Sequence, residues 1–348
     1  METHEKWVPS TTAAMGAALD RMVAARQTPG GVVAAGTVGG SVTEYAATGT
    51  TGVGGSVASG PTTFYDVASL TKVVATWPLV GRAVAHGLLD LEAPVSDHIR
   101  TAIPGPGAAV TVRQILTHTS GLMPATRLDR YTGDSRDLAE MILSEPLDTP
   151  GEHRYINRGF ILLGLLLARV HGKSLRALVD DLGGGLGGGL GLSGLRYGPF
   201  LADDRVAPTE RRLVGGCPLH GVVHDENAAA LGGVAGHAGV FAHAQGLAEL
   251  AHHFLSARQG RGALKDIGAY VGESWKPAVR VDAANSRGLA WLITDTGLVH
   301  HRGFTGTGMY LDPATGRYLV VLTNAIAYGR ERHGLAELHA LALAQFDD

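Results

Sequence analysis

The stretch FYDVASLTKVVAT, residues 64–76, contains the most informative short motif of the chain. It places Ser69 and Lys72 in a Ser-x-x-Lys arrangement, although the chain has only 14 serines and five lysines. Chance therefore predicts about 0.2 such matches. The pattern of the stretch predicts a helix from residue 69. Positions i and i+3 share a helix face, so the amine of Lys72 can reach the Ser69 hydroxyl.

A serine hydroxyl beside a lysine amine can act as a nucleophile. The hydroxyl is weakly nucleophilic until a neighbouring base takes its proton, and a desolvated lysine can do so. Backbone N–H groups at the start of a helix also favour negative charge that develops there. The motif predicts Ser69 as a nucleophile and Lys72 as its partner. The alternative is that Ser69 only caps a buried helix and Lys72 lies on its surface.

A second motif, Tyr155-Ile156-Asn157, follows the turn-like segment TPGE at 149–152. A tyrosine near a lysine cation can have a lowered pKa and share the role of base, and an asparagine amide can hold a substrate carbonyl. Tyrosine and asparagine are also ordinary residues at a junction between a loop and a helix. By itself, the motif leaves both interpretations open.

Strand-like patterns occur at both ends of the chain, and helix-like patterns fill its middle. A helical pattern at 11–26 precedes two β-rich runs at 32–38 and 42–48. Helices are expected at 69–89, 111–118, 136–145, 157–171 and 174–182. Strand patterns return at 288–294, 297–301, 307–312 and 318–324, before a last helix at 332–346.

This arrangement predicts an α+β fold with a discontinuous α/β sandwich. Its antiparallel sheet, flanked by helices, combines N-terminal and C-terminal segments, and a mostly helical subdomain is inserted between them. The expected bounds are 1–75 and 220–348 for the α/β domain and 76–219 for the helical subdomain. The active site is expected in the cleft between the two.

Several stretches resemble, in the same order, the serine β-lactamase and penicillin-binding-protein superfamily, and in particular class C β-lactamases and their esterase relatives. They are DVASLTK at 66–72, ILTHTSGL at 115–122, PGE at 150–152 with YIN at 155–157, GGVAGHAG at 232–239 and HRGFTGT at 301–307. Together they span most of the chain. The resemblance implies that Ser69, Lys72 and Tyr155 are catalytic.

The family's third motif is a Lys or His followed by Thr or Ser and then Gly, and it corresponds here to His301-Arg302-Gly303. The histidine resembles the esterase-like branch, whereas Arg302 departs from the usual small hydroxyl residue. The resemblance also implies an oxyanion hole made by the backbone N–H groups of Ser69 and Phe304. The substrate-binding residues that it implies are Asn157, His301, Arg302 and Gly303.

Two roles stay open for Arg302. Strand residues alternate between the two faces of a sheet, so its side chain can point out of the cleft. Alternatively, its guanidinium binds a carboxylate of the substrate as a bidentate partner.

Composition argues against several other functions. The formal net charge is −3, so no basic field exists to attract nucleic acid. The single cysteine, Cys217, is expected to be a small apolar filler. Among the 16 histidines there is no HExxH and no paired Cys/His spacing, so no metal site is expected. The acyl transfer that the resemblance implies requires no cofactor. His118 is expected to form hydrogen bonds at a helix end, and the glycine-rich stretch 183–194 to be a surface loop.

The start of the chain, METHEKW, is acidic and has no apolar run behind it, so no signal peptide is expected. The longest apolar candidate, 160–170, is shorter than the roughly 20 residues of a membrane span. The sequence therefore predicts a cytoplasmic protein.

The implied reaction is acyl transfer in two steps through an acyl-enzyme on Ser69. An intracellular esterase that acts on a small-molecule ester or amide is the first prediction, favoured by His301 and by the start of the chain. The alternatives are a biosynthetic transacylase or amide synthase, and a β-lactamase or D-amino-acid peptidase. The expected partners are an ester, amide or lactam and an amine or alcohol acceptor, without nucleic acid or membrane. A non-catalytic binding protein of this fold is the alternative from a different class.

Overall fold

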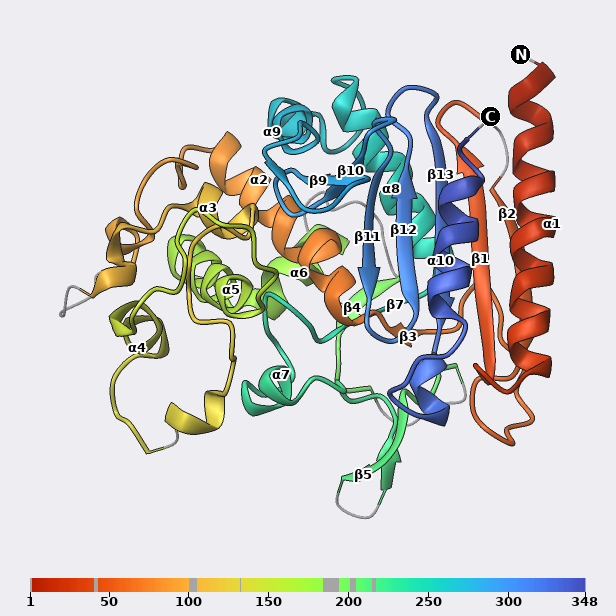
Figure 1. Cartoon of the computed structure of the whole chain (residues 1–348), viewed down its shortest axis with the longest axis horizontal. Coiled ribbons are helices and arrows are strands. Elements are labelled where there is room, and N and C mark those ends of the chain that lie inside the picture. Colours follow the sequence, from red (N-terminus) through yellow and green to blue (C-terminus); the bar gives the residue numbers. More distant parts are fainter. Residues whose placement is uncertain are drawn as a thin grey trace.

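The computed structural model describes residues 2–40, 43–99, 105–131, 133–183, 194–200, 205–214 and 217–347. Within these ranges the largest element is an eight-stranded antiparallel sheet of order β2-β1-β13-β12-β11-β10-β9-β8 (Figure 1). Its strands, in chain order, are β1 Gly30–Thr37, β2 Glu44–Gly49, β8 Val279–Arg280, β9 Asn285–Arg287, β10 Leu292–Thr294, β11 Val299–Gly303, β12 Thr307–Leu311 and β13 Arg317–Thr323.

The two ends of the chain meet in this sheet. Strand β1 pairs with β13 in a register that runs from Gly31 opposite Thr323 to Thr37 opposite Arg317. The middle of β1 has no exposed surface, which is why it reads as a continuous apolar run and lies in the centre of the sheet. The expected α+β class, with a sheet built from N- and C-terminal segments, is confirmed.

Helices cover both faces of the sheet. Helices α1 (Glu2–Ala24) and α10 (Leu335–Ala344) pack on one face, where Trp7, Met15 and Leu19 form a core with Tyr310 and Leu319. Helix α8 (Ala244–Arg258) packs on β1 and β13 from the other face (Figure 1). The sequence analysis does not predict α8. Most of its surface is buried, and a helix covered nearly all round shows little hydrophobic periodicity.

The middle of the chain is mostly helical, as expected. It contains α2 Trp77–Ala85, α3 Val112–Leu116, α4 Leu138–Ser144, α5 Arg158–His171 and α6 Leu175–Gly183. Helix α5 lies at the centre of this part, because it contacts each of the other four helices, α2, α3, α4 and α6. Its run of buried leucines explains this position. Two further short helices are α7 Glu226–Ala230 and α9 Gly268–Ser274.

A small sheet joins this helical part to the rest of the chain. Strands β3 Tyr65–Asp66 and β4 Leu195–Tyr197 pair with β7 Val240–Ala242, which lies between them. A separate pair consists of β5 Glu210–Val214 and β6 Cys217–Leu219. Because β3 and β7 belong to the predicted α/β domain and β4 to the predicted insertion, the small sheet crosses the expected boundary. The domain bounds stay a prediction.

Two local expectations are wrong. The stretch 69–89 is not one regular helix: a 3-10 turn at Ala68–Leu70 and a π-helical turn at Lys72–Thr76 precede α2. The stretch 288–294 is not one strand, since a turn with Ala290 at φ +72° separates β9 from β10. Residues 184–193 of the expected glycine loop and the side chain of Cys217 lie outside the described residues.

In the part of the chain that the structure describes, no helix has the length and apolar character needed to cross a bilayer. The cytoplasmic location stays a prediction.

Candidate active site

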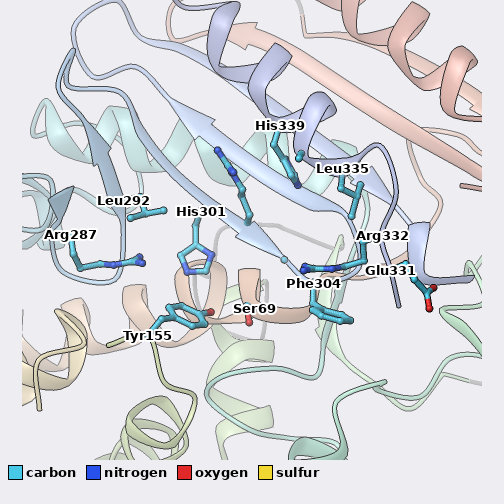
Figure 2. A pocket seen from close by; sticks show the side chains of 13 residues that line it. Ser69, Tyr155, Arg287, Leu292, His301, Phe304, Glu331, Arg332, Leu335 and His339 are labelled. Carbon is cyan, nitrogen blue, oxygen red and sulfur yellow. The ribbon is translucent and has the colours of Figure 1, made fainter. Parts of the chain in front are cut away.

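The turn that carries Ser69 is sharply bent. Ala68, directly before it, has φ +49°, a left-handed conformation that residues with a side chain rarely adopt. The next residues form the short 3-10 and π-helical turns that lead into α2. Ser69 lines a pocket of about 550 Å³ (Figure 2). Lys72, three residues later, is completely buried.

The amine of Lys72 is surrounded by hydrogen-bond acceptors. Its Nζ donates to Ser69 Oγ at 2.9 Å, to Asn157 Oδ1 at 2.9 Å and to the backbone oxygen of His237 at 3.4 Å. An ammonium group has three N–H donors, and these three acceptors match them. The structure thus brings together three residues singled out from the sequence, of which Asn157 comes from the N-terminus of α5.

Tyr155 lies at the mouth of this arrangement and keeps 43% of its surface exposed. Its ring centroid is 4.9 Å from Lys72 Nζ. Desolvation raises the pKa of the Tyr155 hydroxyl. The charge of Lys72, hydrogen bonds with Lys72 and Ser69, and the charge of Arg287 outweigh that effect, so the pKa is lowered overall. The phenolate of Tyr155 therefore forms at a lower pH than that of a free tyrosine, which suits a general base.

Strand β11 presents alternate side chains to the two faces of the sheet. His301 faces Tyr155, with ring centroids 6.3 Å apart. Burial, together with the positive charges of Arg287 and Lys72, holds the pKa of His301 well below its ordinary value. His301 is therefore neutral at physiological pH.

Arg302 lies on the opposite face of β11, toward α10. It shares that face with His300, which is paired with Tyr310 across the sheet. Arg302 hydrogen-bonds with Tyr310, whose hydroxyl also contacts His339 Nδ1 at 2.5 Å. Arg302 nevertheless lines the far end of the pocket that contains Ser69. Its role in substrate binding stays a prediction.

Gly303 allows β11 to touch the turn that carries Ser69. A Cβ atom at Gly303 would lie 2.4 Å from the backbone oxygen of Val67 and 2.2 Å from Thr307 Oγ1, much closer than real atoms approach. We expect Gly303→Ala to lower the free energy of unfolding by about 1–3 kcal/mol, as overpacking does, and to impair activity. Urea unfolding measures the first effect and turnover the second.

Gly272→Ala is the matched control for this substitution. Gly272 lies in α9, where a Cβ would meet nothing closer than 3.8 Å, so alanine is expected to be neutral or stabilising. A Gly303→Ala protein as stable and active as the Gly272→Ala protein would contradict the close approach of β11.

Arg287 is a site residue that the sequence analysis missed. It lines the pocket but is itself only 4% exposed, and its NH1 donates to the backbone oxygen of Ala290 at 2.9 Å. Its Nε reaches His153 Nε2 at 3.4 Å, and among the described residues no carboxylate pairs with it. Desolvation lowers the pKa of Arg287 to about 10. No short motif surrounds Arg287 in the sequence, so only the fold reveals that it faces Tyr155.

His118 supports the segment that carries Tyr155. It follows the end of α3 with φ +57°, and its Nδ1 accepts the N–H of Ile156 at 3.3 Å. Its ring centroid lies 4.6 Å from that of Tyr155. This is the hydrogen-bonding role expected for a residue after a helix end. Among the described residues, no cluster of three or more histidine, cysteine or acidic side chains could hold a metal ion.

Of the other predicted site residues, Gly303 and Phe304 also line the pocket with Ser69, whereas Lys72 and Asn157 are not among the residues that line it. Figure 2 shows Tyr155, Ser69 and Phe304 along one side of the pocket, with His301 above them and Arg332 near Phe304. The catalytic and binding roles of these residues stay predictions.

Comparisons with known proteins point in one direction. The sequence profile of the family described as Beta-lactamase matches residues 17–344. An N-acetylmuramyl-L-alanine amidase from Bacillus subtilis is 27% identical over 306 residues, covering 75% of this chain and 68% of the relative. A putative D-alanyl-D-alanine carboxypeptidase from Escherichia coli K12 is 27% identical over 305 residues, covering 75% and 69%. A class C beta-lactamase from Rhodobacter sphaeroides has a similar fold, with a TM-score of 0.74 at 20% identity, covering 95% of this chain and 99% of that one.

Proposed function

The chain belongs to the beta-lactamase family, and from that membership and the geometry around Ser69 we propose that it is a serine acyl hydrolase. The observation that carries the proposal is the 2.9 Å hydrogen bond from the buried amine of Lys72 to Ser69 Oγ, with Tyr155 beside both. A nucleophile within reach of a base that is itself held by a third group is the arrangement of covalent catalysis.

The proposed reaction has two steps. Tyr155 accepts the proton of Ser69 while Oγ attacks the carbonyl carbon of the substrate, and Lys72 stabilises the phenolate by its charge. The negative oxygen of the tetrahedral intermediate accepts hydrogen bonds from the backbone N–H groups of Ser69 and Phe304. Tyr155 then returns the proton to the leaving group as its bond to the carbonyl breaks. Water, or an amine or alcohol, attacks the acyl-enzyme and releases Ser69 by the reverse transfers.

A small ester is the first substrate class that we propose. His301 faces Tyr155 as a neutral side chain, so the third motif adds no cation on the side of β11 that faces Ser69. A carbonyl compound without an anionic group can therefore occupy the position beside His301, because this histidine adds no charge there that needs a counter-charge. An alkoxide or phenoxide also leaves more readily than an amine and demands less of the proton donor.

A second candidate is hydrolysis of an amide or peptide that carries a free carboxylate. The observation that favours it is Arg287, a buried guanidinium in the pocket with no carboxylate partner among the described residues. A buried charge without a counter-charge is costly, and an anionic substrate group would pair with it. The names of the two 27% identical relatives, an amidase and a carboxypeptidase, favour the same class.

The two candidates differ in what Arg287→Met should do. If Arg287 binds a carboxylate, kcat/KM for acyl donors with a carboxylate falls roughly tenfold to a hundredfold more than for neutral donors, as for loss of a hydrogen bond to a charged group. Arg302→Ala is the matched variant, because Arg302 lines the same pocket from the other face of β11. A selective loss in Arg302→Ala would assign the carboxylate to Arg302. Equal losses for acidic and neutral donors in both variants would refute an anion subsite.

The proposal as a whole is tested with p-nitrophenyl butyrate, nitrocefin and a D-Ala-D-Ala peptide. The mass of the intact protein after each incubation reports acylation, and release of product reports turnover. The preferred compound separates esterase from lactamase and peptidase, and added amine or alcohol that captures the acyl group identifies a transacylase. A protein inert toward all three and toward a fluorophosphonate would overturn the proposal in favour of a binding protein.

A further inference from the structure

A buried pair of Asp66 and His224 lies behind the turn that carries Ser69. Oδ2 of Asp66 accepts hydrogen bonds from the backbone N–H of His224 at 2.9 Å and meets its Nδ1 at 3.1 Å. The carboxylate has no exposed surface, and the histidine side chain is 7% exposed. Nothing in the proposed proton transfers uses either residue, although both are titratable.

The other atoms of Asp66 hold the turn itself. Its Oδ1 accepts the N–H of Ala68 at 2.8 Å, and its backbone oxygen accepts the hydroxyl of Thr305 at 2.7 Å. A residue with a side chain at φ +49°, like Ala68, costs on the order of 1–3 kcal/mol and persists only where its surroundings hold it. Asp66 therefore stabilises the strained residue whose neighbour is Ser69.

His224 contacts the other predicted half of the oxyanion hole. Its ring stacks on the ring of Phe304, with centroids 5.7 Å apart and an interplanar angle of 9°. Phe304 follows β11, and Ser69 follows β3, so the two predicted N–H donors come from segments more than 230 residues apart. The pair contacts both segments, because Asp66 accepts a hydrogen bond within the turn that carries Ser69 and His224 stacks on the ring of Phe304.

We propose that Asp66 and His224 form a positioning pair. The pair fixes the backbone N–H groups of Ser69 and Phe304 relative to each other, so that both can donate to the same oxyanion. The inference rests on the proposed acyl-enzyme function. Neither residue lines the pocket that contains Ser69. The charge of Asp66 and its hydrogen bond outweigh the desolvation of His224, so that the pKa of His224 is raised above its ordinary value. A protonated His224 strengthens the contact with the carboxylate, since a charge-assisted hydrogen bond is the stronger kind.

The test compares His224→Ala with His224→Asn, whose side-chain amide can still donate to Asp66. Three readouts are measured: kcat and KM with an ester that the wild type turns over, affinity for phenylboronic acid, and thermal unfolding. The boronate forms a tetrahedral adduct with the serine and places an oxygen in the oxyanion hole. His224→Ala is expected to lower kcat by roughly tenfold to a hundredfold, somewhat less than full loss of one oxyanion donor. KM should change less than threefold, boronate affinity should fall in parallel with kcat, and His224→Asn should recover most of both.

His220→Ala is the matched control, because His220 lies in the same segment and contacts the backbone oxygen of Val206 at 2.7 Å, away from Ser69. It should leave kcat and boronate affinity unchanged. Phe304→Leu removes the stacked ring but keeps the backbone N–H, so it should lower kcat in the same direction, and its effect should not add to that of His224→Ala. This variant tests the pair even if His224→Ala does not fold.

Two results would overturn the inference. One is a folded His224→Ala protein with kcat and boronate affinity within threefold of the wild type. The other is a loss that Asn does not recover and that raises KM as much as it lowers kcat, which indicates general damage to the pocket. Both require an active wild type, so failure of the proposed function, seen as a wild type that is never acylated, is distinguished from failure of the pair.

Discussion

Replacement of Ser69 by alanine is expected to abolish acyl-enzyme formation and to lower kcat/KM by roughly 10⁴- to 10⁶-fold, the range known for loss of a serine nucleophile. The reason is that, in the proposed reaction, Ser69 Oγ forms the covalent bond itself, and it is the serine hydroxyl that accepts a hydrogen bond from the Lys72 amine. The fold should survive, because Lys72 keeps its contacts with Asn157 and with the backbone oxygen of His237.

The measurement is the mass of the intact protein after incubation with the ester, the lactam and the peptide, with release followed in parallel. Wild type should gain the mass of the acyl group or turn the compound over, and the Ser69→Ala protein should do neither. Ser10→Ala serves as control, since Ser10 lies on α1, where its hydroxyl donates to the backbone oxygen of Trp7. Continued acylation of the Ser69→Ala protein would place the nucleophile elsewhere.

The parts of the site that the sequence predicted are those with local spacing. Ser69 and Lys72 are three residues apart, so any helical turn brings their side chains together. Tyr155 and Asn157 flank the start of α5, where the helix pattern itself fixes their position. The sheet was predictable for a similar reason, because its strands show continuous or alternating apolar patterns at the two ends of the chain.

The missed residues depend on contacts between distant segments. Asp66 and His224 are 158 positions apart, and neither belongs to a spacing that indicates a pair. Arg287 looks like an ordinary strand residue until the fold buries it beside Tyr155. Arg302 is a different case, since the alternation of β11 alone implies that it and His301 face opposite sides. The sequence could not show which of the two faces of β11 is turned toward Ser69.

The identity of the general base is the point on which the mechanism can be tested most directly. Lys72 Nζ donates hydrogen bonds to Ser69 Oγ, to Asn157 Oδ1 and to the backbone oxygen of His237, and the lowered pKa of Tyr155 favours its phenolate. We therefore assign proton transfer to Tyr155. Tyr155→Phe keeps the ring but removes the hydroxyl, and it is expected to lower kcat/KM by about 10²- to 10⁴-fold, as for loss of a general acid–base group.

The dependence of kcat/KM on pH tests whether Tyr155 is the general base. In the proposed mechanism the phenolate of Tyr155 accepts the proton of Ser69. We therefore expect kcat/KM of the wild type to rise with pH through the pKa of Tyr155, with a midpoint below the ordinary value of 10.0. The residual activity of Tyr155→Phe should lack that rise. Arg287→Met should move the midpoint to higher pH, because the charge of Arg287 contributes to lowering the pKa of Tyr155. Profiles of kcat/KM for a neutral ester, measured on all three proteins, decide the matter. A rise that persists in Tyr155→Phe at an unchanged midpoint would transfer the role of base to Lys72 and leave Tyr155 with substrate positioning alone.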